Sequence, residues 1–393
     1  MKTFIHYLQT RSKPLRLCEE NIASLRETIF RITKTPTYFK SGILVALNNI
    51  KFFFRPSTGK ATLKKQFMNQ PVIDLHCDLL SYLTRSNSSI YKTEDVGCAV
   101  PYLKEGNVKL QIMAIFAPVE SNSHDYGLKQ SEIFRDLNSQ ENELYRFEKH
   151  HLETFATNEN IGMLASVESG SAFCDENISL KEGFENLERI IENVGSIMYI
   201  SFTHHAENRF GGGNYSAVGL KNDGKALIDY IHNRNIAIDF SHTSDALAHD
   251  ILNYISKENI SVPIMASHSN YRPVYDHKRN LPDDIAKEII HQKGLIGLNF
   301  VRAFVNPEKV EALEEHVAHG ISLGAENAIC YGADYFYTKD NPDKSRIPFY
   351  FKEHGNADCY PRINKVLEQQ FGAEQMKKIS SQNALEFIER LWS

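Results

Sequence analysis

Eight short apolar runs follow one another after Pro71, and they constrain the fold more than any other feature of the sequence. Each run is rich in β-branched residues and apolar on both faces, which is typical of strands in a buried parallel sheet. Longer amphipathic stretches with helical periodicity separate the runs. The runs span residues 72–76, 110–116, 162–168, 196–204, 236–242, 262–269, 294–300 and 328–334.

This alternation predicts an α/β fold, a distorted (β/α)₈ TIM-like barrel, over residues 71–393. A doubly wound open sheet is the alternative. No low-complexity tract interrupts the region, so we treat it as one domain. We expect its helices at residues 131–157, 180–194, 219–234, 244–259, 282–292, 307–320 and 372–391.

Residues 1–70 differ from the rest of the chain in charge. They contain 13 Lys and Arg residues and 3 acidic residues, a net charge of +10, although the whole chain carries −5. We predict that they form a separate, basic, partly helical N-terminal extension. It packs on the acidic body, contacts an anionic membrane surface or serves as an organelle address. Nucleic acid is a less favoured partner, because no recognisable binding module accompanies the charge.

The same segment bears on the location of the protein. No apolar run long enough for a secretory signal precedes the first basic cluster. The most apolar stretch, residues 41–54, is too short for a membrane-spanning helix. The six cysteines form no CxxC pair, which favours isolated buried thiols in a reducing compartment. We therefore expect a cytoplasmic protein, with peripheral membrane association as an open alternative.

Most of the apolar runs end in a side chain that can bind a metal or transfer a proton. The carboxyl ends of parallel barrel strands meet on one face, where active sites of such barrels lie. Random placement would scatter these residues over both ends, so their joint position predicts a functional site. The residues are His76, Asp78, Glu168, His204, His242, His268 and Asp334.

Their chemistry suits a pair of metal ions. In a strand, residues i and i+2 point to the same side, so His76 and Asp78 can face one cation together, which suits Zn²⁺. Glu168 can bridge two cations, and His242 and His268 can complete the ligand shell of the second metal. Two such ions can hold one hydroxide and polarise a carbonyl.

Three further side chains can then take part in hydrolysis. Asp334 can orient the bridging water and take its proton as a general base. His204 can donate to the developing oxyanion. Arg279 lies in a polar stretch after the sixth run, and a planar guanidinium is the best anchor for a substrate carboxylate.

At these residues the chain resembles the membrane dipeptidase family, the renal-dipeptidase-like zinc peptidases with an amidohydrolase-type barrel. The resemblance covers residues 71–391, and its most specific piece is the SHS…RNxPDD stretch. The matching pieces are IDLHCDLL, SVESGSAF, SFTHHAEN, IDFSHTSD, MASHSNYRPVYDHKRNLPDD, GLIGLNF and YGADY.

The resemblance implies a distorted barrel with two Zn²⁺, often in a homodimer, that hydrolyses dipeptides, including those with a C-terminal D-residue. His76 and Asp78 would match the ligands of one zinc. His242 and His268 would match those of the other, and Glu168 would bridge the two ions. By the same resemblance, the carbonyl is polarised by His204, the terminal carboxylate is held by Arg279 and the water's proton is handled by Asp334.

The segment 332–337, GADYFY, departs from the family's usual GxDFDG. Asp334 is retained, but Phe336 replaces the second acid and Tyr337 replaces the glycine. This change bears on how the substrate's amino group is held. The alternative function is therefore a related binuclear amidohydrolase that acts on N-acyl amino acids or another small amide. A binding or scaffolding protein that retains the barrel is the third hypothesis.

Other segments carry no predicted chemistry. Residues 210–214, FGGGN, lack the GK[ST] of a phosphate-binding loop, so we expect a turn or a flexible loop of the active site. The remaining histidines of interest lie in predicted loops or helices, and we expect them at the surface. They are His124, His150, His151, His316 and His319.

Overall fold

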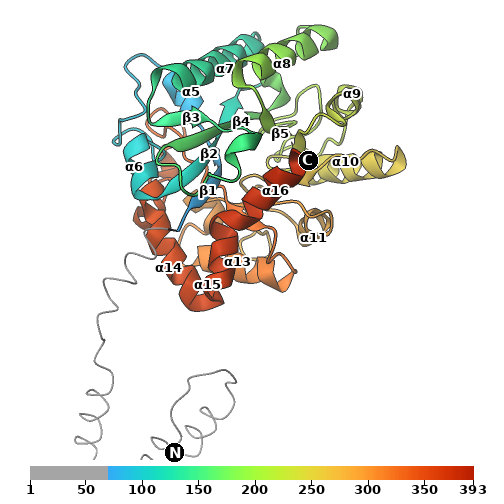
Figure 1. Cartoon of the computed structure of the whole chain (residues 1–393). Coiled ribbons are helices and arrows are strands. Elements are labelled where there is room, and N and C mark those ends of the chain that lie inside the picture. Colours follow the sequence, from blue (N-terminus) through green and yellow to red (C-terminus); the bar gives the residue numbers. More distant parts are fainter. Residues whose placement is uncertain (1–69) are drawn as a thin grey trace, which may run out of the picture. The chain divides into compact units, whose positions relative to one another are not determined.

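A computed structural model describes residues 70–393 of the chain (Figure 1). The prediction of a basic, partly helical extension over residues 1–70 lies outside the described residues, apart from residue 70. The division of the chain at residue 70 therefore stays a prediction.

The described residues form an α/β barrel of eight parallel strands that is nearly closed, with a ninth strand, β3, at its side. The strands pair in the order β7-β6-β5-β4-β2-β1-β9-β8, and a parallel bridge between Ala266 and Ile296 links the two ends. Each of the eight predicted runs overlaps one of these strands. They are β1 Val72–Cys77, β2 Val108–Phe116, β4 Ile161–Glu168, β5 Ile197–Ser201, β6 Ala237–Asp239, β7 Ile264–Met265, β8 Ile296–Leu298 and β9 Ile329–Tyr331.

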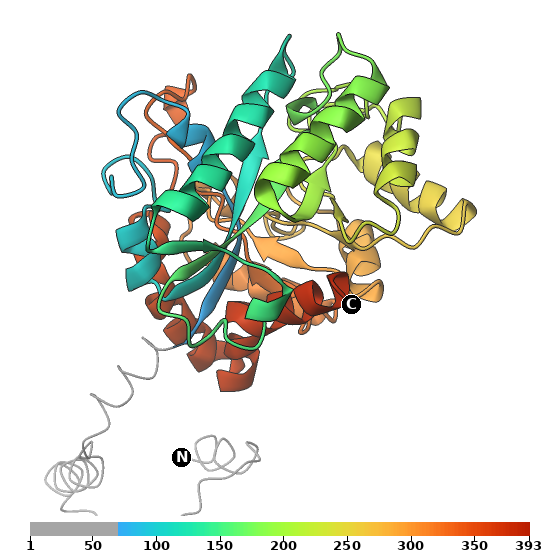
Figure 2. The same cartoon turned by 45° about the horizontal axis from the view of Figure 1, so that its top comes forward.

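Helices surround the strands, as Figure 2 shows. The strand order, nearly closed by the bridge between Ala266 and Ile296, confirms the barrel and excludes the open sheet. Helix α8 begins and ends at the predicted residues, because Ser179 caps its N-terminus and Gly195 follows its C-terminus. The longer helices are α7 Ser123–Gln140, α8 Leu180–Val194, α9 Asn222–Ile231, α10 Asp245–Lys257, α11 Asp283–His291, α13 Ala312–Ser322, α14 Tyr360–Phe371 and α16 Asn383–Leu391.

The prediction of one helix over residues 131–157 is wrong. Helix α7 ends at Gln140, and the chain then forms the short strand β3, Leu144–Arg146, which pairs in parallel with β4. Leu144 and Phe147 are buried there. The apolar side chains that suggested a continuing helix face are therefore the buried side of an extended segment.

The amino ends of the strands are closed by apolar packing. One cluster of buried side chains joins the barrel interior, including Ile73, Leu110 and Leu295, to helix α16 and Trp392 at the C-terminus. The opposite ends of the strands carry the polar residues. The barrel therefore has an apolar base and a polar mouth, which is the arrangement of enzymes with this architecture.

Of the five histidines expected at the surface, only His150 is exposed, and His124, His151 and His319 are partly buried. His316 is fully buried, because its Nδ1 accepts a hydrogen bond from the Tyr271 N–H and its Nε2 lies 2.9 Å from the Val305 carbonyl oxygen. The five described cysteines are free and buried, as predicted. Within residues 70–393, no helix combines the length and the hydropathy needed to cross a bilayer.

Candidate metal centre and active site

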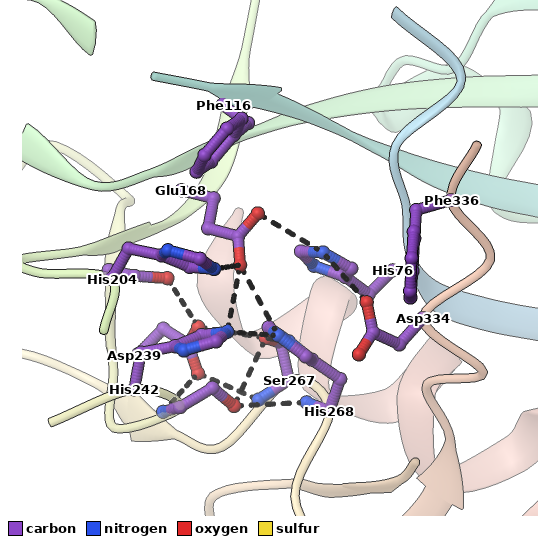
Figure 3. Close-up of polar contacts among 12 residues, drawn as sticks. His76, Phe116, Glu168, His204, Asp239, His242, Ser267, His268, Asp334 and Phe336 are labelled. Carbon is purple, nitrogen blue, oxygen red and sulfur yellow. Dashed lines mark hydrogen bonds and ion pairs between the residues drawn. The ribbon is translucent and has the colours of Figure 1, made fainter. Parts of the chain in front are cut away.

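The predicted polar residues converge at the carboxyl ends of the strands (Figure 3). His76 belongs to β1, and Glu168 is the last residue of β4. The others directly follow strands or lie within a few residues of them. The structure groups their ligand atoms within 4.8 Å in overlapping sets: His76 with Asp78 and Glu168, Glu168 with His242 and His268, and His76 with His268 and Asp334.

Glu168 lies between two sets of candidate ligands, which form the two halves of this centre. His76 and Asp78 make up one half, and His242 and His268 make up the other. The Oε1 of Glu168 is 2.9 Å from His242 Nε2 and 3.5 Å from His268 Nε2, and the two imidazole nitrogens are 3.1 Å apart. Its Oε2 is 3.5 Å from His76 Nε2. One carboxylate therefore faces both sets of ligands, which is the position that a bridging group requires.

His76 and Asp78 each have a buried ligand atom without a hydrogen-bond partner in the described part of the chain, as expected for residues that bind a cation. His76 Nε2 and Asp78 Oδ1 are buried and have no hydrogen-bond partner among residues 70–393. Buried polar atoms rarely stay unpaired, since each costs about 1–3 kcal/mol. Both atoms belong to the set that faces Glu168. A metal ion bound there would satisfy them, so the donor set fits such an ion.

The hydrogen bonds of His76 and His268 leave a lone pair on the Nε2 atom of each ring, and each Nε2 lies 3.5 Å from the Glu168 carboxylate. Tyr199 donates its hydroxyl proton to the Leu75 carbonyl at 2.8 Å, so it accepts from His76 Nδ1, also at 2.8 Å. Ser267 donates to Asp239, so its Oγ accepts from His268 Nδ1 at 2.6 Å. With the protons on Nδ1, both Nε2 atoms carry lone pairs, the form in which imidazole binds a metal.

Asp239, in β6, was missed by the sequence analysis, although it organises one half of the centre. Its carboxylate accepts hydrogen bonds from the hydroxyls of Ser201 and Ser267 and from the backbone N–H groups of Ser241 and Ser267. It thereby fixes the segments that present His242 and His268. An acid inside an apolar run, as in IDFSH, is the only signal that the sequence offers for it.

Asp74, in β1, plays the corresponding part in the other half and was also missed. It accepts from the backbone N–H groups of His76 and Ala333 and from the Tyr360 hydroxyl. Asp334 is connected to the same strand, because its N–H donates to the His76 carbonyl at 3.2 Å. Asp74 therefore links the strand of His76 to the segment of Asp334.

His204 and His205 are partly exposed, in contrast to the buried Glu168. His204 Nε2 is 3.9 Å from Glu168 Oε1, and both histidines form a further possible ligand set with His242. His205 Nδ1 is 2.9 Å from Asn214 Oδ1, in the glycine-rich segment, which therefore forms part of the site. The sequence analysis missed His205, although the adjacent His-His pair could have indicated it.

Burial shifts the acid–base equilibria of the centre. Desolvation raises the pKa of Glu168 to about 8 and that of Asp334 to about 6, and it raises the pKa of Asp78 well above its usual range. Desolvation also lowers the pKa values of His242 and His268 well below the usual range. Carboxylates and neutral histidines held this way are suited to a bound cation, whose charge favours the ionised acids.

Asp334 and Arg279 lie beside the candidate metal ligands. Asn299, another residue that the sequence analysis missed, donates to Asp334 Oδ2 at 2.8 Å. Asp334 has a φ of 63°, an uncommon conformation that turns the chain directly after β9. Arg279 is 3% exposed and donates to Ser269 Oγ and to the His268 carbonyl, both at 3.0 Å.

Two phenylalanines flank the centre in Figure 3. Phe116, the last residue of β2, packs against His204 with ring centroids 4.9 Å apart. Phe336 lies beside Asp334 and packs against Phe349 at 5.6 Å. The segment that departs from GxDFDG therefore places an aromatic ring, rather than an acid, next to Asp334.

Comparisons with known proteins agree with this geometry. The family model described as membrane dipeptidase, peptidase family M19, matches residues 61–391. An uncharacterised dipeptidase of Schizosaccharomyces pombe is 25% identical over 317 residues, 72% of this chain and 74% of that protein. The dipeptidase aclJ of Aspergillus oryzae is 22% identical over 331 residues, 77% of this chain and 76% of that protein.

Solved structures show the same fold. A metallopeptidase described as dipeptidase AC superposes with a TM-score of 0.69 at 18% identity, covering 82% of this chain and 99% of that one. A metallopeptidase of Rhodobacter sphaeroides, liganded with a phosphinate mimic of the dipeptide L-Ala-D-Ala, gives the same TM-score, identity and coverage.

Proposed function

Because this chain belongs to the membrane dipeptidase family, peptidase family M19, it is a metallo-dipeptidase, and we propose that it works with two zinc ions. His76 and Asp78 would hold one ion, His242 and His268 would hold the other, and Glu168 would contribute its carboxylate to both. The observation that carries this proposal is the pair of buried, unpartnered ligand atoms, His76 Nε2 and Asp78 Oδ1, facing the shared carboxylate.

When bound, the two ions supply an activated water and polarise the scissile carbonyl. Asp334 accepts the proton of the attacking water on its carboxylate and then donates it to the leaving amine. Asn299 holds that carboxylate in position through its 2.8 Å hydrogen bond. His204 stays neutral, because burial lowers its pKa well below the usual range, and it donates to the oxygen that becomes negative.

Arg279 binds the terminal carboxylate of the substrate. Its Nε is buried and has no hydrogen-bond partner among the described residues, although both terminal nitrogens donate to the protein. A guanidinium fixed in this way is pre-organised for a carboxylate, since little freedom is lost on binding. This anchor restricts the enzyme to short substrates with a free C-terminus.

The substrates are dipeptides, including those with a D-residue at the C-terminal position. The ligand of the Rhodobacter metallopeptidase, an L-Ala-D-Ala mimic, supports this range, because that protein shares the fold. A panel of L,L and L,D dipeptides tests it with the zinc-loaded enzyme. If the fully zinc-loaded enzyme cleaved neither series, that result would contradict the proposal.

A second candidate activity is hydrolysis of N-acyl amino acids. Phe336 favours it, because the ring beside Asp334 offers no charge to a substrate ammonium. A dipeptide and its N-acetylated analogue separate the two activities. Faster cleavage of the free amine supports the dipeptidase, and tolerance of the blocked amine supports the alternative.

Three further features complete the proposal. The enzyme forms a homodimer, which light scattering tests by the mass in solution. It is cytoplasmic, which the free and buried cysteines of the described part support and which fractionation of cells tests. Residues 1–70, with their net charge of +10, bind anionic membrane surfaces, which sedimentation with phosphatidylserine vesicles tests.

A further inference from the structure

Two guanidinium groups share one aromatic ring at the rim of the active site. The Cζ of Arg279 lies 5.6 Å from the centroid of the Phe304 ring, and the Cζ of Arg346 lies 5.1 Å from it. The His277 ring is 5.0 Å from the same centroid, and His277 Nδ1 accepts a hydrogen bond from the Arg279 N–H. Phe304 thus gathers two permanent cations that come from different loops.

Arg346 has no acidic partner among residues 70–393. Its side chain forms no ion pair or hydrogen bond within this part of the chain, and its Nε is buried and unpartnered. The contacts that it does make are aromatic, with Phe304 and with Phe349, whose centroid is 5.4 Å away. Stacking uses the face of a guanidinium and leaves the N–H groups of its edge free for an anion.

The neighbours of Arg346 place it over the active site. Phe349 packs against Phe336, which lies beside Asp334 (Figure 3). The Phe304 ring, which Arg346 also contacts, lies against the Arg279 guanidinium. Arg346 therefore faces the same substrate space as Arg279.

We propose that Arg346 binds a second anionic group of the substrate, the side-chain carboxylate of a C-terminal aspartate or glutamate. This inference rests on the proposed function, in which Arg279 holds the terminal carboxylate. The two carboxylates of such a residue are joined by a short aliphatic chain, and the two guanidinium groups share one ring. The second carboxylate therefore belongs to the C-terminal residue rather than to the N-terminal one.

The test compares each acidic dipeptide with its uncharged amide counterpart. The zinc-loaded full-length enzyme is assayed on Ala-Glu against Ala-Gln and on Ala-Asp against Ala-Asn, with the C-terminal residue in both L and D forms. One charge-assisted contact predicts a kcat/KM ratio, acid over amide, of about tenfold in at least one stereochemical series. The ratio should fall as salt concentration rises.

Variants assign the preference to Arg346. Arg346→Gln should reduce the ratio to about one, and Arg346→Lys, which keeps the charge without the planar fork, should give an intermediate ratio. Lys344→Gln is the matched control. It removes a positive charge from the same loop, but this lysine is exposed and donates to the Lys339 carbonyl instead of stacking on Phe304.

The outcomes separate this inference from the proposed function. A wild-type ratio near one in both series, with good cleavage of neutral dipeptides, overturns the inference and leaves the dipeptidase standing. A high ratio that survives in a folded Arg346→Gln or Arg346→Lys enzyme also overturns it. An enzyme that cleaves neither acidic nor neutral dipeptides contradicts the proposed function itself.

Discussion

Asp74 and Asp239 are buried aspartates in corresponding places, one in each half of the metal centre, but they act on different groups. Asp239 reaches a ligand ring, because Ser267 joins its carboxylate to His268 Nδ1. Asp74 holds backbone N–H groups and the Tyr360 hydroxyl. Both aspartates therefore hold backbone N–H groups, but only Asp239 is also joined to a ligand ring; the His76 ring is held by the Tyr199 hydroxyl instead.

The two halves also differ in how many of their polar atoms are satisfied. In the half with Asp74, His76 Nε2 and Asp78 Oδ1 have no partner within residues 70–393. In the other half, His242 Nε2 lies 2.9 Å from Glu168 Oε1 and 3.1 Å from His268 Nε2, so both nitrogens have a polar neighbour within hydrogen-bond distance. The comparison teaches that one half is largely pre-organised by the protein, while the other depends on a bound cation for its final arrangement.

The largest effect should come from breaking the link between the halves. Glu168→Gln keeps the size of the side chain and removes the charge that both sets of ligands face. We expect kcat/KM to fall by about a thousandfold or more, since both ions lose a ligand. Steady-state kinetics and zinc analysis measure the loss. Glu185→Gln, an exposed position on α8, is the control, and equal activity of the two variants would contradict the bridging role.

In the metal-free protein, the two halves should respond to pH in opposite directions. Burial raises the pKa of Asp334 to about 6, above its unfolded value of 3.8. Its stabilising contribution is therefore complete below pH 3.8 and is lost as pH rises through 6. Burial lowers the pKa of His205 to about 4 from 6.5. Its contribution is complete above pH 6.5 and is lost as pH falls through 4.

Each of these losses amounts to about 3 kcal/mol, since one pKa unit corresponds to about 1.4 kcal/mol. Urea unfolding of chelator-treated protein between pH 4 and 8 measures them. Because the two windows overlap between about pH 4 and 6, the two contributions largely cancel in the wild type. Asp334→Asn should therefore give a stability that rises with pH across this window, and His205→Asn should give one that falls. Parallel pH profiles for the wild type and both variants would show that neither residue titrates as its burial requires.

A smaller effect should distinguish the two aspartates. Asp239→Asn can keep an acceptor for the N–H groups of Ser241 and Ser267. However, it puts a donor where the hydroxyls of Ser201 and Ser267 now donate, which disturbs the Ser267 contact with His268. We expect the affinity for the ion held by His242 and His268 to fall by about 10–100-fold. Asp74→Asn should weaken the other ion instead. Stepwise zinc titration resolves the two sites, and loss of the same ion in both variants would remove the distinction between the halves.

The residues that could be predicted from the sequence lie at ends of apolar runs. His76, Glu168 and His268 directly follow or end runs whose strand character is local, so their common position follows from the topology of a parallel barrel. Arg279 was predicted from its chemistry and the family resemblance. The structure places these residues together, but their roles in catalysis stay predictions.

The residues that could not be predicted depend on distant partners. Asp74 and Asp239 are embedded in apolar runs, where the sequence pattern predicts only a buried strand. Asp74 is paired with Tyr360, which lies 286 positions away, and no local pattern indicates such a contact. Strand β3 was missed for a similar reason, since its pairing with β4 overrides the helical periodicity of 131–157.

The most direct test of the account is a count of metal ions against activity. Metal-free enzyme is titrated with zinc while bound metal and dipeptide hydrolysis are measured together. The account predicts that activity reaches its maximum at two ions per chain and that His76→Ala leaves one ion bound at the half with Asp239. Full activity with one ion per chain, or with none, would contradict the two-ion centre.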